Sequence, residues 1–127
     1  MPRNKVLFAC MFLFGLATCD NAYYKQGENL YKSNCSSCHM DDGSGLSNFI
    51  PPLNLTSSKD TVMLGELVCV ISKGINNPDS ILQMPPHPQL TDIEITNLIN
   101  FLLNDMSKKN QFINLDQTKS YLSQCDD

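Results

Sequence analysis

At 127 residues the chain has room for one domain of ordinary size, and its 42% hydrophobic residues are typical of a globular protein rather than a disordered one. No apolar run approaches the ~20 residues that span a bilayer, so a membrane-spanning helix is not expected. The formal net charge of −4 at pH 7 disfavours a nucleic-acid partner and suits contact with a positively charged protein surface.

The first residues have the pattern of an export signal. A short basic start precedes an apolar run from Val6 to Leu16, which has the length of a signal-peptide core. The run leads into a sequence before Cys19 that resembles a bacterial lipobox. We therefore expect residues 1–18 to be removed and a lipid on Cys19 to anchor the protein on the periplasmic side of the membrane. Ordinary cleavage after Ala17 would instead release a soluble periplasmic protein.

The sharpest motif follows a segment, residues 21–34, whose apolar side chains have helical spacing. Cys35, Cys38 and His39 form a Cys-X-X-Cys-His sequence, which is the attachment motif of c-type haem. Two thiols at this spacing reach two vinyl groups of one porphyrin, and the histidine that follows is carried beneath the iron. A zinc half-site would need a second ligand pair, and a thioredoxin-like redox site would need alternating strands and helices. Neither requirement is met in the rest of the sequence.

The remaining elements are helices and loops. Residues 40–55 are rich in Gly, Ser, Asp, Asn and Pro and are expected to form a loop. Residues 61–73 are predicted to form a helix that ends at Gly74, and residues 76–79 a turn. A capping box of Thr91 and Glu94 opens a further helix over residues 92–104, and a short helix is expected near residues 115–123. The predicted fold class is therefore all-α.

A haem iron held by His39 needs a sixth ligand or has an open site. Met84 is the best candidate, because its thioether binds low-spin iron and the two prolines after it keep the segment extended. His87 is the rival, since imidazole also binds iron and it lies three residues further along. A weak or absent sixth ligand would instead fit a haem protein that binds gas or peroxide.

Two cysteines remain once the signal, lipid and haem cysteines are assigned. Cys69 and Cys125 are an even remainder in a compartment where disulfides persist. A bridge between them would tie the C-terminal tail to the middle of the fold. The alternative is that each is a separate buried thiol that packs as a small apolar side chain.

The stretch from about residue 23 to residue 104 resembles class I cytochromes c, in particular the bacterial mono-haem domains similar to cytochrome oxidase subunit III. The matching positions are Gly27, Tyr31, the Cys35–His39 motif, Asp42-Gly43-Ser44-Gly45, Pro51-Pro52-Leu53, Gly74-Ile75, Met84-Pro85-Pro86 and the capped helix. The resemblance implies a small cytochrome c fold around one covalent haem c. It also implies that the Pro51 carbonyl, or that of Pro52, orients His39, and that Gly27 lies where the first and last helices of the fold cross.

The resemblance implies an electron carrier rather than an enzyme, with donor and acceptor proteins in membrane respiratory complexes. The other functional hypothesis is a haem subunit of a larger oxidoreductase. We expect a cytochrome domain over residues 19–106 and a C-terminal extension over residues 107–127.

Overall fold

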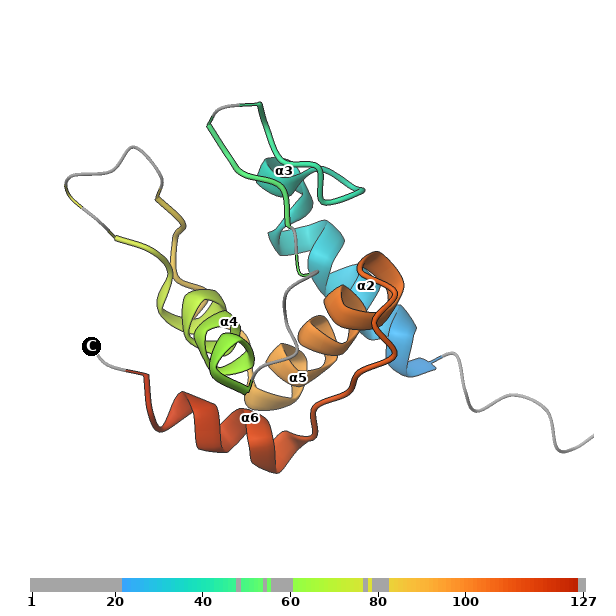
Figure 1. The fold of residues 1–127 in the computed structure, drawn as a ribbon, viewed down its shortest axis with the longest axis vertical. Coiled ribbons are helices and arrows are strands. Elements are labelled where there is room, and N and C mark those ends of the chain that lie inside the picture. Colours follow the sequence, from blue (N-terminus) through green and yellow to red (C-terminus); the bar gives the residue numbers. More distant parts are fainter. Residues whose placement is uncertain are drawn as a thin grey trace, which may run out of the picture.

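The computed structural model describes residues 22–47, 49–53, 55, 61–76, 78 and 83–125, so the predicted export signal and Cys19 lie outside the described residues. The described elements, seen in Figure 1, are α2 (Ala22–Asn34), α3 (Ser36–His39), α4 (Thr61–Lys73), α5 (Asp92–Phe101), the π-helical turn η1 (Leu102–Met106) and α6 (Leu115–Leu122). In this part of the chain the β-structure consists of two isolated β-bridges, Leu46 with Ile50 and Ile75 with Met84. The predicted all-α class is confirmed.

Helices α2 and α5 cross at Gly27, which is buried. A Cβ atom on Gly27 would lie 2.6 Å from Phe101 Cβ and closer still to the Asn97 carbonyl oxygen. Only glycine therefore lets the two backbones approach this closely. The ring of Tyr31, one turn further along α2, packs on Phe101 with 5.7 Å between centroids. The crossing falls at Asn97–Phe101 of α5, so Gly27 lies at a crossing of two helices, as the resemblance implied.

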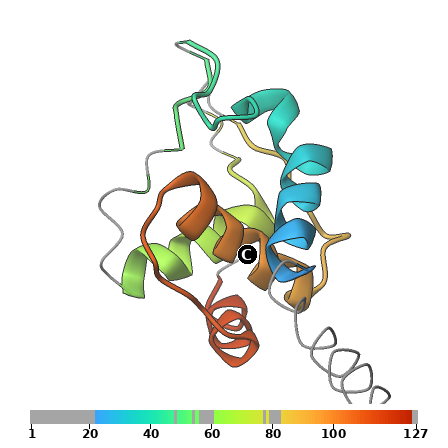
Figure 2. The same ribbon diagram turned by 90° about the vertical axis from the view of Figure 1, so that its right-hand side faces the viewer.

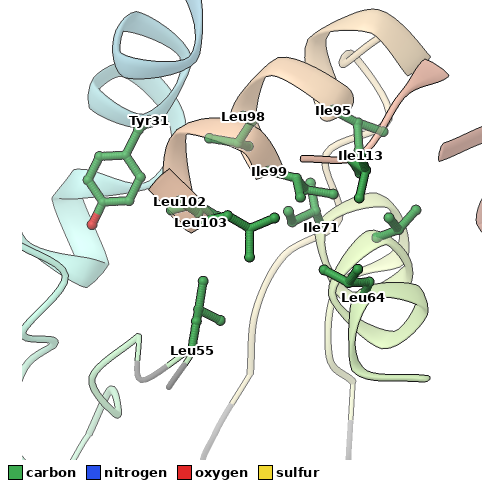
Figure 3. Close-up of a cluster of buried hydrophobic side chains, with 11 residues drawn as sticks. Tyr31, Leu55, Leu64, Ile71, Ile95, Leu98, Ile99, Leu102, Leu103 and Ile113 are labelled. Atoms are coloured by element: carbon green, nitrogen blue, oxygen red, sulfur yellow. The ribbon is translucent and has the colours of Figure 1, made fainter. Parts of the chain in front are cut away.

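The hydrophobic core lies where α5 and η1 meet α4 and the C-terminal tail (Figure 3). Its buried members are Tyr31, Leu55, Leu64, Val68, Ile71, Ile95, Leu98, Ile99, Leu102, Leu103 and Ile113. On α5 these positions recur every three or four residues, which makes one apolar face. Helix α5 is therefore central: it packs on α2, which leads into the Cys35–His39 motif, and on α4, whose end is paired with Met84 through Ile75.

The start of α5 agrees with its sequence signal, whereas its end differs from the prediction. Thr91 caps the helix, and the Glu94 side chain accepts the Thr91 N–H at 2.8 Å. The α-helix ends at Phe101 rather than at residue 104, and a π turn follows. In this turn the Asn104 side chain donates to the Asn100 carbonyl at 2.9 Å and to the Gln111 carbonyl at 2.8 Å.

The C-terminal tail is packed against the helices rather than hanging free, as the rotated view in Figure 2 also shows. The Asn100 side chain bonds both the N–H and the carbonyl of Ile113, each at 2.9 Å. Thr118 of α6 is fully buried and accepts a hydrogen bond from Thr96 of α5 at 2.8 Å. Residues beyond 106 thus share the core of the preceding helices.

A disulfide joins the same tail to α4. Cys69 and Cys125 are bonded, with 5.4 Å between their Cα atoms. Close to this bond the ring of Tyr121 lies against Gly65, where a Cβ atom would come within 3.2 Å of it. The segment of α6 is therefore held to α4 both covalently and by packing. Of the two alternatives that the sequence allowed, a disulfide or two separate thiols, the structure has the disulfide.

Candidate functional site

The Cys-X-X-Cys-His motif lies at the turn from α2 into α3. The Cys35 N–H donates to the Tyr31 carbonyl at 2.8 Å, which continues the α2 hydrogen bonds into the motif. The His39 N–H donates to the Cys35 carbonyl at 2.9 Å and closes a single helical turn. Both thiols are free; Cys35 is half-buried and Cys38 is exposed. This short helix carries both sulfur atoms and the imidazole to one end of the helix pair.

The electrostatics of Cys35 argue against a reactive redox thiol. Burial and, to a smaller extent, the neighbouring Cys38 together raise the pKa of the Cys35 thiol to about 11. Thioredoxin-like sites instead lower a cysteine pKa, because the thiolate is the nucleophile. The thiol of Cys35 is therefore protonated at neutral pH, and the thioredoxin-like alternative has no support at this position.

The imidazole of His39 has an unusual environment. Its Nδ1 atom is buried, and no hydrogen-bond partner is found for it among the described residues. Burial lowers the pKa of His39, which favours the neutral ring that binds metals. A buried ring nitrogen without a partner is costly in a protein interior. An Nδ1 atom without a partner therefore fits a histidine whose hydrogen bonds form only when its ring binds a ligand.

Gly45 brings the Pro51 segment close to His39. The Gly45 N–H donates to the His39 carbonyl at 3.1 Å, and its φ of +72° is in the left-handed region. A Cβ atom on Gly45 would lie 2.8 Å from the Pro51 carbonyl oxygen. The backbone of Pro51 therefore reaches the His39 side of the site, although the structure shows no hydrogen bond between this carbonyl and Nδ1 among the described residues.

Met84 lies on a separate segment that is tied to the end of α4. The Ile75 N–H donates to the Met84 carbonyl at 2.8 Å, and the Met84 N–H donates to the Ile75 carbonyl at 3.0 Å. Figure 1 shows this segment above α4 and the loop after α3 projecting to the same side of the helices. The bridge thus fixes the extended backbone that the Met-Pro-Pro sequence predicted.

Two adjoining cavities bring the predicted residues together. One has a volume of about 180 Å³ and is walled mostly by apolar side chains of α2, α4 and α5, together with Cys35; the other, of about 140 Å³, opens beside Cys38. Both are lined by His39, Pro51, Ile75 and Met84. We call this pair of cavities the crevice. The sequence placed His39 and Met84 on opposite sides of one cofactor, and both side chains line this one crevice.

His87 is placed differently. Its Nδ1 atom lies 3.2 Å from the Gln89 amide nitrogen, and that amide also donates to the Asn34 side chain at 3.3 Å. Among the described residues, the side chains that line the crevice do not include His87. The ring is therefore engaged at the surface beside the end of α2.

Two contributors were not anticipated from the sequence. The Tyr31 hydroxyl donates to the carbonyl of Met40, the residue after His39, whose φ of +64° is left-handed. Burial of this hydroxyl raises the pKa of Tyr31 to about 12, with smaller contributions from Cys35, Asp42 and Asp41. Ile75 lines both cavities as well as bonding Met84. The sequence marked Tyr31 and Ile75 as matching positions, but it contains no signal for these contacts.

A surface hollow of about 630 Å³, larger than either cavity of the crevice, lies away from these residues. It is walled by charged side chains of α2, of η1 and of the segments after α3 and η1, including Lys25, Glu28, Asp105 and Lys108. It includes none of the predicted site residues. Size alone would thus point to the wrong place, and the chemistry of the lining identifies the crevice.

The residues of the crevice fit a covalently bound haem. The two free thiols lie at its edge, an unpartnered buried imidazole faces it, and its walls are predominantly apolar. A planar apolar cofactor that forms two thioether bonds and accepts an axial nitrogen requires this donor set. Met84 adds a sulfur donor on the segment that is bonded to Ile75.

Comparisons with known proteins agree with this reading. A family model described as "Cytochrome C oxidase, cbb3-type, subunit III" matches residues 22–102, well over half of the chain. The chain is also 32% identical, over 82 residues, to the cytochrome c subunit of the quinone alcohol dehydrogenase of Gluconobacter oxydans (strain 621H). That match covers 60% of this chain and 17% of the relative, so the chain corresponds to only a small part of the relative's length. In the described residues no helix has the length and apolarity needed to cross a membrane.

Proposed function

Because the chain belongs to the family of c-type cytochrome domains of cbb3-type cytochrome c oxidase subunit III, we propose that it carries single electrons on one haem c whose iron is held between His39 and Met84. Haem-based electron transfer and covalent haem c follow from the family. The axial pair is our proposal. The observation that supports it best is that His39 and Met84, 45 positions apart in the sequence, line the same two cavities.

The assigned roles follow from chemistry and position. Cys35 and Cys38 would form the thioethers, and His39 would supply an axial nitrogen. We propose that the carbonyl of Pro51 would accept the Nδ1 proton of His39, in the way that outer-shell partners orient metal-bound imidazoles; its support is that Pro51 and His39 line the same two cavities. Met84 would supply the second axial atom, and the placement of His87 beside Gln89 favours this assignment.

Bound in the crevice, the haem supplies a one-electron iron(III)/iron(II) couple. The protein's part is to hold both axial atoms so that nothing binds or leaves when an electron arrives. The apolar walls exclude water and disfavour the extra positive charge of the oxidised state. A thioether ligand acts in the same direction, because it raises the potential relative to a second imidazole. We therefore propose a carrier without a catalytic step of its own.

We expect Met84→Ala to open the iron to external ligands. The variant should lose the weak red-end absorption band of methionine-bound ferric haem, and its reduced form should bind carbon monoxide. The matched control is His87→Ala, which should keep the band and remain unreactive. The measurement is a carbon monoxide difference spectrum of each reduced protein. If His87→Ala reacts with carbon monoxide and Met84→Ala does not, the ligand assignment is reversed.

The name of the relative supports a second arrangement, in which this chain is the haem subunit of a larger oxidoreductase. Its electrons would then come from a dehydrogenase and pass to a membrane respiratory complex. Purification of the native protein in mild detergent separates the two arrangements. A free carrier runs at the size of one small domain, whereas a subunit elutes with a large partner.

We also propose export and a lipid anchor on Cys19, with removal of residues 1–18, a cytochrome domain over residues 19–106 and an extension beyond it. The apolar run before Cys19 is the main support. The Cys69–Cys125 disulfide adds to it, because such bonds persist in oxidising compartments such as the periplasm. Mass spectrometry of the mature protein tests the anchor: two acyl chains on an N-terminal Cys19 would support it, and a free N-terminus at Thr18 would refute it.

A further inference from the structure

Gly74 lies between the end of α4 and the Met84 segment, in contact with both. Its N–H donates to the Val70 carbonyl at 2.9 Å and closes the last turn of α4. Its φ of +76° is left-handed, which is the usual conformation of a glycine that ends a helix. The sequence accounts for this role, and a helix end alone would explain the residue.

The surroundings of Gly74 show a second constraint. A Cβ atom on Gly74 would lie 2.7 Å from the Pro86 nitrogen, 2.9 Å from the Pro85 carbonyl carbon, and closer still to the Met84 carbonyl oxygen. Real Cβ atoms essentially never come within 3.0 Å of such atoms, so one of the two segments would have to shift. All three neighbours are backbone atoms, which cannot rotate away as a side-chain end can.

The next residue leaves the Met84 segment little freedom to adjust. Ile75 holds Met84 through two hydrogen bonds of 2.8 Å and 3.0 Å. Pro85 and Pro86 have no N–H group, so they cannot extend this pairing or replace it elsewhere. A displacement of the backbone at Met84 would therefore break the bridge or move Ile75, which itself lines the crevice.

We propose that Gly74 is a positioning residue for the second axial ligand: its missing side chain lets the backbone of Met84–Pro86 lie close enough to α4 for the Met84 sulfur to reach the iron. This proposal rests on the proposed ligation by Met84. An iron–sulfur bond to a thioether is weak and forms over a narrow range of distance, so a shift of several tenths of an ångström at the Met84 backbone favours its loss.

Gly43 provides a matched control within the same chain. Its φ of +72° is nearly that of Gly74, so a side chain would be equally unfavourable there on conformational grounds. The nearest atom to its Cβ, at 2.7 Å, would be the terminal methyl carbon of Met106, and the next would be Leu53 Cβ at 3.5 Å. A flexible methionine end can move aside. Gly43→Ala therefore imposes the left-handed strain without displacing backbone at Met84.

The test compares Gly74→Ala, Gly74→Asn and Gly43→Ala with the wild type, each as full-length, haem-loaded protein. Asparagine tolerates a positive φ better than alanine but carries the same Cβ atom. The Asn variant therefore accumulates even if strain prevents the Ala variant from folding. The readouts are haem staining of denatured protein, the methionine–iron(III) band, carbon monoxide binding by the reduced form, and the midpoint potential.

We expect all variants to retain covalent haem. The wild type and Gly43→Ala should show the band and no carbon monoxide binding. Both Gly74 variants should lose most of the band, bind carbon monoxide and have a lower midpoint potential. If Gly74→Asn keeps the band and the wild-type potential, the proposal is overturned, because the Cβ atom is then accommodated. A wild type without the band would remove the Met84 ligation itself, and the role of Gly74 with it.

Discussion

Replacing Cys35 and Cys38 together with serine should leave a chain that no longer unfolds cooperatively near the wild-type melting temperature. Without the thioethers the haem is not retained, and the apolar walls of the crevice then face water. Four apolar side chains of these walls that are not buried by the protein alone are Leu53, Leu67, Val70 and Ile75. Fully burying a side chain of this size contributes about 1.5–3 kcal/mol, so the loss approaches the whole stability of a small domain, about 5–15 kcal/mol.

Thermal unfolding followed by circular dichroism measures this effect. Ser37→Ala is the matched control, because Ser37 is an exposed residue between the two cysteines, and it should leave the transition unchanged. A Cys35→Ser, Cys38→Ser protein that melts cooperatively within a few degrees of the wild type would contradict the account. The helices would then be held by their own packing, and the haem would contribute little to the stability of the fold.

Replacing Cys69 and Cys125 together with alanine should lower the free energy of unfolding by about 4 kcal/mol, as loop-closure entropy predicts for cysteines 56 residues apart. The bond connects α4 to the tail, so its loss frees the unfolded chain over nearly half of the sequence. Most of the native contacts of α6, such as the Thr96–Thr118 hydrogen bond, do not depend on the sulfur atoms. The variant should therefore still fold, but with a lower midpoint of denaturation.

Chemical denaturation of the haem-loaded protein, followed by far-ultraviolet circular dichroism, gives this difference. Ser123→Ala, an exposed change near the same end of α6, serves as the control and should cost little. If the free energy of unfolding of the double cysteine variant falls by less than about 1 kcal/mol, the prediction is wrong. The unfolded chain would then be almost as restricted without the disulfide as with it. The tail would then be a packed element that does not need its disulfide.

Local signals in the sequence predicted most of the helices. The 61–73 helix agrees with α4, whose end at Gly74 follows from a left-handed residue after the last turn. The start of α5 follows from the reciprocal bonds of Thr91 and Glu94. These features depend only on residues that are neighbours in the sequence, so they can be predicted without the fold.

Features that depend on contacts between distant segments could not be predicted in this way. One such feature is the turn after Phe101, where Asn104 bonds both the Asn100 carbonyl and the backbone of Gln111. Nothing in the spacing of two asparagines distinguishes this arrangement from surface positions on an ordinary helix. The packing of the tail onto α4 and α5 could not be predicted for the same reason.

In the site, too, the local features could be predicted and the contacts between distant segments could not. Cys35, Cys38 and His39 are fixed by a local motif, and the chemistry of thioethers and an axial imidazole explains their spacing. Met84 was selected by its sulfur and its prolines, but only the fold shows that it lines the crevice with His39. The close approach of Gly74 to the Met84 backbone is a tertiary contact. The sequence indicates Gly74 as the end of a helix but contains no signal for this contact.

The absorption spectrum of the matured full-length protein, oxidised and reduced, with and without carbon monoxide, distinguishes an iron held by both His39 and Met84 from one with an open position. We predict low-spin haem with sharp reduced bands, the methionine–iron(III) band in the oxidised form, and no change with carbon monoxide. A high-spin spectrum, or a reduced spectrum that shifts with carbon monoxide, would contradict ligation by both His39 and Met84. The haem would then have an open position, and binding of gas or peroxide would replace simple electron transfer as the leading function.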